Sequence, residues 1–165
     1  MNINVDSLNS GFSKEVEFES NIALPKSLVY HQDVYIKGKG TITNSYGKYT
    51  FEGNIIANVV FNCNSCLKEF SQKIVFDMVE VFSKDMTDDD EIWVFSSKDN
   101  IIHLEEPIKT NLLLNLPMKA LCSENCKGLC HVCGHNLNEG DCGCDRDYID
   151  PRFEKFLHLF KNKEV

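Results

Sequence analysis

Eight cysteines dominate the chemistry open to this 165-residue sequence. Six of them fall within 23 residues, and the other two form an isolated C-x-x-C that ends 56 residues before the group. Cysteine thiolates bind soft metal ions, and four of them around one tetrahedral ion make the closed site typical of structural zinc. We therefore predict that one or two structural Zn²⁺ ions are held by the following residues: Cys63, Cys66, Cys122, Cys126, Cys130, Cys133, Cys142 and Cys144.

The spacing of the C-terminal cysteines suggests how they divide. Cys130 and Cys133, followed by Gly134, have the form of a zinc knuckle, in which two intervening residues let both sulfurs face one ion. Gly134 can adopt the positive φ that this turn often needs. Cys142 and Cys144 can supply the second pair of that site.

The four other cysteines then form a second foursome, which ties the upstream C-x-x-C to the C-terminal region: Cys63, Cys66, Cys122 and Cys126. Spacing alone leaves other partitions open, and His131 or His135 is an alternative ligand. We expect these two histidines to support the ligands or to lie exposed.

Other uses of the cysteines fit less well. The N-terminal residues contain no export signal, so four disulfides are not expected. A thioredoxin-like C-x-x-C needs a βαβ setting, whereas Cys63 and Cys66 lie between two predicted antiparallel strands. An iron–sulfur cluster stays open, because four cysteines can also hold iron. A catalytic zinc keeps an open position, and no H-E-x-x-H, phosphate-binding loop or nucleophile elbow is present, so we predict that the protein is not an enzyme.

Composition is that of an ordinary globular protein, with 42% apolar and 25% charged residues. No apolar run is long enough to span a membrane, and we expect a cytoplasmic protein. The net charge of −8 lies in residues 1–108, which hold 9 basic against 17 acidic residues, while residues 109–165 hold 8 of each. A basic footprint over the whole protein is therefore absent, which leaves a protein partner or a local RNA contact near the C-terminal end.

Alternation of apolar and polar residues predicts half-buried strands over residues 14–24, 34–43, 49–63 and 70–82. The first strand carries Glu15, Glu17 and Glu19 on its polar face, which we interpret as solvated rather than catalytic. Gly38 and Gly40 inside the second strand indicate a bend, a bulge or a close backbone approach, and Gly53 indicates a bend in the third. The last of the four is apolar on both faces, as is typical of a central strand.

The remaining elements are short strands and two helices. Short strands are expected at 92–95 and 101–104, after the acidic, loop-like residues 84–91. A helix is expected to open at Glu106-Pro107, with Pro107 at its first position, and to stop at Pro117. A second helix is expected to start at Asp150-Pro151 and to carry this apolar stripe: Phe153, Phe156, Leu157 and Phe160.

The predicted fold class is α+β and mainly antiparallel β, with two helices. Residues 1–117 form a β-rich platform, either a sheet or a partly open barrel, with one helix near its end. Residues 118–165 form a cysteine-rich zinc module and the C-terminal helix, packed with the platform as one compact unit.

The C-terminal motifs also resemble a known family. The pattern consists of Leu116-Pro117, Cys126-Lys-Gly-Leu-Cys130, Cys133-Gly134, Asn136-Leu-Asn138, Cys142, Cys144 and Ile149-Asp-Pro-Arg-Phe153. With the upstream C-x-x-C and the N-terminal strand pattern, it is similar to the YceD family, the large ribosomal RNA subunit accumulation proteins. His131 departs from that pattern, because relatives commonly carry proline there.

The resemblance implies a noncatalytic role in making the large ribosomal subunit, through accumulation of its 23S ribosomal RNA. It implies bacterial, cytoplasmic relatives and plastid members in plants. Some members lack most of the C-terminal cysteines yet keep the upstream C-x-x-C, which favours a structural role for the C-terminal metal.

Three hypotheses follow for partners. The module holds cationic side chains that can contact phosphates of 23S RNA or its precursor: Lys119, Lys127, Arg146 and Arg152. These four can equally be solvated surface residues. Alternatively, the acidic strands clasp a basic large-subunit ribosomal protein. A thiol redox or zinc-dependent enzyme is the third, least favoured hypothesis. We expect neither a membrane nor a small-molecule substrate as a partner.

Overall fold

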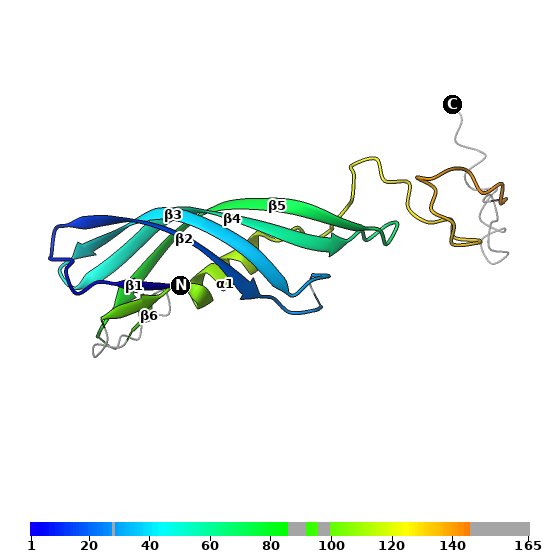
Figure 1. The fold of residues 1–165 in the computed structure, drawn as a ribbon. Helices are drawn as coiled ribbons and strands as arrows, with labels where there is room; N and C mark the ends of the chain where they lie inside the picture. Colours follow the sequence, from blue (N-terminus) through cyan, green and yellow to red (C-terminus); the bar gives the residue numbers. More distant parts are fainter. Residues whose placement is uncertain (28, 86–91, 96–99, 146–165) are drawn as a thin grey trace, which may run out of the picture.

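The structure is a computed structural model that describes residues 1–27, 29–85, 92–95 and 100–145. Its centre is a curled five-stranded sheet in the order β2-β3-β4-β5-β6 (Figure 1). The strands of this sheet are β2 Ser13–Ala23, β3 Asp33–Ser45, β4 Lys48–Asn62, β5 Glu69–Ser83 and β6 Ile92–Val94. The mainly antiparallel β fold predicted from the sequence is confirmed.

A second, two-stranded sheet packs into the same hydrophobic core. It pairs β1 (Asn2–Asn4) with β7 (Ile101–His103), and the chain then enters α1 (Glu105–Asn115). The prediction of a short strand at 101–104 is therefore confirmed, whereas its partner β1 was not predicted, because three residues are too few to show a period. Within the described residues, no helix is both long and apolar enough to cross a bilayer.

Strands β2 to β5 form an antiparallel meander whose register runs without interruption. In β4 the odd-numbered residues from Tyr49 to Phe61 are buried, apart from half-buried Gly53, and the even-numbered residues are half-buried or exposed. Alternation arises because successive side chains of a strand point to opposite faces. The sheet thus has one apolar face and one face that meets solvent.

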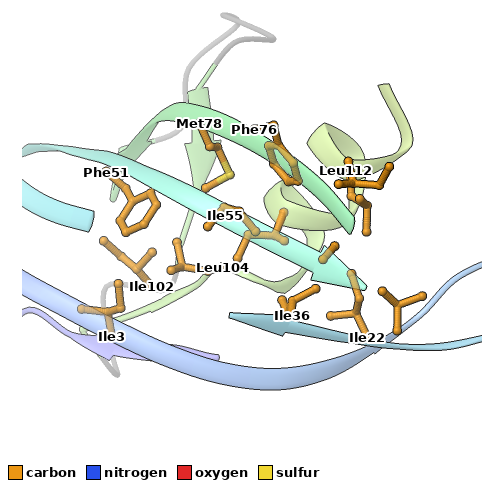
Figure 2. Close-up of a cluster of buried hydrophobic side chains, with 14 of the residues drawn as sticks. Ile3, Ile22, Ile36, Phe51, Ile55, Phe76, Met78, Ile102, Leu104 and Leu112 are labelled. Carbon is orange, nitrogen blue, oxygen red and sulfur yellow. The ribbon is translucent and has the colours of Figure 1, made fainter. Parts of the chain in front are cut away.

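The core lies on the inner, concave face of the sheet. Figure 2 shows side chains of the sheet, such as Ile36 and Ile55, facing Ile102 of β7, Leu104 just before α1, and Leu112 of α1. All five are essentially inaccessible to solvent. Burying one such aliphatic side chain stabilises a fold by about 1.5–3 kcal/mol, so the packing of α1 and the β1–β7 sheet against the five-stranded sheet contributes to the stability of the fold.

Strand β5 differs from the expectation of a central strand. It lies between β4 and β6 in the sheet, but β6 pairs with it, in parallel, only over Val81–Ser83. The outer-face residues Val75 and Val79 are 52% and 63% exposed. The apolar residues on both faces therefore reflect a buried inner face and an uncovered outer one within the described chain.

Helix α1 starts earlier than the sequence suggested. Its first residue is Glu105, so Pro107 is the third helical residue and not the first. A proline is still tolerated there, because the first four N–H groups of a helix have no partner within it. Glu105 and Glu106 lie in the first turn, as predicted, and Ile108 and Leu112 are buried. The predicted second helix, 150–160, lies outside the described residues.

Gly40 and Gly53 are directly opposite each other in the β3–β4 ladder. A Cβ atom on Gly53 would lie 2.7 Å from the carbonyl oxygen of Lys39 and 2.9 Å from the Phe51 ring. A Cβ atom on Gly40 would lie 2.7 Å from the Cα of Gly53. The structure therefore supports close backbone approach at Gly40, which was one of three predicted alternatives, and also at Gly53; the ladder carries no bulge there.

This contact predicts the effect of adding one methyl group. We expect Gly53→Ala to destabilise the fold by about 1–3 kcal/mol, because backbone and the Phe51 ring must move apart. The neighbouring, exposed Glu52→Ala should change stability by less than about 0.5 kcal/mol. Urea unfolding of the two variants tests this, and equal stabilities would contradict the packing argument.

Candidate metal centres

The β4–β5 hairpin presents the first two cysteines. Cys63 follows the last residue of β4, and its N–H donates to the carbonyl of Lys68 at 2.8 Å across the turn. The N–H of Leu67 donates back to the carbonyl of Cys63 at 2.9 Å, and Leu67 has a φ of 60°. This tight turn buries Cys63 and Cys66 and directs both sulfurs to one side.

The segment after α1 brings the next two cysteines to the same place. It is held against the hairpin by a hydrogen bond of 2.8 Å from the N–H of Asn64 to the carbonyl of Ala120. The Sγ atom of Cys122 then lies 3.6 Å from that of Cys66. The Sγ atoms of Cys126 and Cys63 are 3.7 Å apart. We call these four residues the hairpin site: Cys63, Cys66, Cys122 and Cys126.

The last four cysteines form a separate group farther along the chain, which we call the tail site: Cys130, Cys133, Cys142 and Cys144. The N–H of Gly134 donates to the carbonyl of Cys130 at 2.8 Å, and the N–H of Cys130 donates to that of His135 at 2.8 Å. Gly134 has a φ of 75°, as expected for the knuckle turn. Figure 1 shows this part of the chain extending beyond the hairpin end of the sheet.

Both groups fit a tetrahedral metal ion. In each, the four sulfur atoms all lie within 4.8 Å of one another. With Zn–S bonds of about 2.3 Å, the sulfurs of a tetrahedron are about 3.8 Å apart, close to the 3.6 and 3.7 Å of the hairpin site. All eight cysteines are free, and these separations far exceed the bond length of a disulfide. The donor set could therefore hold one ion in each group.

The pKa values of the thiols also favour a bound cation in each group. Burial raises the pKa of Cys63, but nearby backbone N–H groups lower it to about 6. Backbone N–H groups of the knuckle likewise lower the pKa of Cys130 to about 6. Burial and the neighbouring thiols raise the pKa of Cys122 to about 12, and contacts with neighbouring thiols raise that of Cys144 to about 12. Four adjacent thiols resist ionising together, because like charges repel, unless a cation lies among them.

The grouping of sulfurs is the one favoured from the sequence. His131 and His135 are exposed and belong to neither group in the described chain. The structure describes two of the four residues predicted to contact RNA. Lys119 and Lys127 are exposed and form no ion pair among the described residues, whereas Arg146 and Arg152 lie outside them.

The acidic face of β2 is less available to a basic protein partner than its composition suggested. Glu17 forms an ion pair of 2.8 Å with Lys39, and Glu19 one of 2.7 Å with Lys37. The hydrogen bond from each lysine lowers the pKa of its glutamate. Two of the three glutamates thus already have cationic partners in the neighbouring strand.

Sequence reasoning missed two features beside the cysteines. A groove of about 300 Å³ adjoins the hairpin site, where the loop after β2 meets the end of β4 and the segment after α1; its lining includes Lys26, Phe61, Asn64 and Met118. The second feature is the role of Asn138, which belongs to the motif named above and whose Nδ2 atom lies 3.4 Å from the Sγ atom of Cys126. No periodic pattern marks the groove, because its walls come from three distant segments.

Comparison with known proteins gives the family. Residues 51–160 match the family model described as large ribosomal RNA subunit accumulation protein YceD. Uncharacterised proteins of Mycobacterium bovis and Mycobacterium tuberculosis are 30% identical to the chain over 113 residues, which is 65% of this chain and 53% of each relative. The chain therefore spans about half the length of these relatives.

A plant protein matches a shorter part. The large ribosomal RNA subunit accumulation protein YCED homolog 1, chloroplastic, of Zea mays is 39% identical over 51 residues, 30% of this chain and 17% of that protein. No solved structure matches the chain. Because the matched region includes the β4–β5 hairpin, helix α1 and all eight cysteines, the chain belongs to the YceD family.

Proposed function

We propose that this protein is a ribosome biogenesis factor that supports accumulation of 23S ribosomal RNA and assembly of the large ribosomal subunit. The observation that carries the proposal is the pair of closed four-cysteine groups in a chain of this family. The family and its plant member are named for accumulation of large-subunit ribosomal RNA. The protein acts in the cytoplasm, on RNA or protein partners, without a membrane or a small-molecule substrate.

Each four-cysteine group holds a structural Zn²⁺ ion in this proposal. Four thiolates fill a tetrahedral coordination sphere, which leaves no open position to activate water or substrate. The metal therefore supplies shape and not chemistry, and the protein is not an enzyme. The need for a metal also follows from the sparse burial in residues 121–145, where the buried residues are Gly128 and Cys130.

The module is proposed to contact ribosomal RNA through cations held in fixed positions by the metal. Lys119 and Lys127 are exposed on the segment that supplies ligands to the hairpin site. Lysine side chains contact phosphates without reading sequence. Arg146 and Arg152 remain candidates for the same role. The alternative, a clasp around a basic ribosomal protein, loses support because Glu17 and Glu19 are already paired with lysines.

Metal content tests the zinc sites directly. We expect two zinc ions per chain in protein purified without a metal-binding tag, and one after Cys63→Ser with Cys66→Ser. The matched control, His131→Ala, should keep two, because this exposed histidine is outside both groups. Elemental analysis of each variant gives the count; iron in place of zinc, or a count of two in the double serine variant, would contradict the assignment.

Chelation should affect the two parts of the chain differently. Removing the metal should unfold residues 121–145, because so few of them are buried, while the platform keeps its core. Hydrogen exchange with and without chelator measures this residue by residue. Loss of protection in β3 and β4 together with the module would show that the platform also depends on the metal.

RNA binding tests the proposed surface. Charge reversal at both Lys119 and Lys127 should weaken binding to a 23S ribosomal RNA transcript. It should also reduce the slope of log K against log salt concentration by about 2, because two phosphate contacts are lost. Lys48→Glu, at the opposite end of β4, serves as the matched control. Unchanged RNA binding in the double variant rejects this surface. Crosslinking in cells that recovers a basic ribosomal protein and no 23S RNA favours the clasp instead.

A further inference from the structure

The side chain of Asn138 links the two four-cysteine groups. Asn138 belongs to the eight-residue loop between Cys133 and Cys142, two residues of the tail site. Its Nδ2 atom donates to the Sγ atom of Cys126, a residue of the hairpin site, at 3.4 Å. Its Oδ1 atom accepts from the N–H of Lys127 at 2.9 Å. One amide thus holds both the sulfur of Cys126 and the backbone that follows it.

A short hydrogen-bond network fixes the orientation of this amide. The Oδ1 atom of Asn136 accepts from the N–H of Asn138 at 3.1 Å and from its Nδ2 atom at 2.8 Å. The Nδ2 atom of Asn136 in turn donates to Glu139 at 3.0 Å. Both donors and the acceptor of the Asn138 side chain therefore have partners. A flipped amide would set its oxygen against the sulfur and its NH₂ group against an N–H, so this orientation is the favourable one.

The backbone of the same loop also lies against the segment between the two groups. The N–H of Leu137 donates to the carbonyl of Gly128 at 3.0 Å, and Leu129 forms a bridge with Asn136. The loop is exposed apart from half-buried Asn136 and Leu137, so burial contributes little to holding it. A metal ion shared by Cys133 and Cys142 would fix both ends of the loop and so offset the conformational entropy that a loop of this length loses when it orders.

We propose that Asn138 is a positioning residue that couples the two metal sites, so that a metal ion in the tail site strengthens metal binding in the hairpin site. This inference rests on the proposed zinc sites. Metal in the tail site orders the loop, and the ordered loop donates an N–H group to the Cys126 thiolate, which carries negative charge in a four-thiolate site. Linkage is reciprocal, so metal in the hairpin site strengthens the tail site by the same factor.

The test measures Zn²⁺ affinity at the hairpin site of the full-length chain, by competition with a chelator. Asn138→Ala should lower this affinity about 10-fold or more, as is usual when a group that supports a metal ligand is lost. Cys133→Ser with Cys142→Ser, which removes the tail site, should lower it similarly. In that background Asn138→Ala should add nothing, because the loop no longer delivers the amide. The matched control, Asn125→Ala, removes an exposed amide beside Cys126 and should have no effect.

A spectroscopic measurement separates this role from a general loss of stability. With Co²⁺ in place of Zn²⁺, the sulfur-to-metal charge-transfer band of the hairpin site should shift in Asn138→Ala and not in Asn125→Ala. Circular dichroism of the sheet checks that each variant is folded. Two bound zinc ions with unchanged affinity and spectrum in Asn138→Ala overturn the coupling alone. A wild-type chain that binds no zinc overturns the proposed metal sites and the coupling with them.

Discussion

The antiparallel pairing of β4 with β5 is the interaction on which the rest of the structure depends. It joins fifteen residue pairs, from Lys48 and Ser83 at one end to Asn62 and Glu69 at the other. Its inner face supplies much of the core that α1 covers, and its closed end is the turn that carries Cys63 and Cys66. A long ladder of this kind sets one register, because a slip of one residue would move every apolar side chain to the solvent face.

Beyond Pro117 the physical basis of the structure changes. The platform is organised by a hydrophobic core, whereas residues 121–145 bury only Gly128 and Cys130 and contain no helix or strand. Their order comes from turns, amide hydrogen bonds and the convergence of eight sulfur atoms. Half of the hairpin site comes from each part of the chain, so this group is also the joint between them.

In our proposal the protein acts by presenting a surface to its partners. The proposed binding role rests on the two four-cysteine groups, the exposed outer sheet face and the exposed lysines near the hairpin site. The internal ion pairs of the β2–β3 ladder reduce the acidic character of the sheet locally, although the first 108 residues carry the whole net charge of −8. A contact with RNA is therefore confined to the module in our proposal, where basic and acidic residues balance.

Local patterns in the sequence determined most of the elements of this protein. The period-two alternation predicted β2 to β5 to within about two residues, because strand periodicity is imposed by the side chains' own geometry. The cysteine spacings predicted the metal-binding chemistry and favoured one grouping. Tertiary structure alone decided the rest. The hydrogen bond between Asn64 and Ala120 holds the two halves of the hairpin site together and so fixes which sulfurs are grouped. The arrangement of the sheet leaves Val75 and Val79 of β5 exposed. The fold of the C-terminal loop places Asn138 next to Cys126. These outcomes depend on contacts between distant segments, and no local period or spacing records which segments will meet.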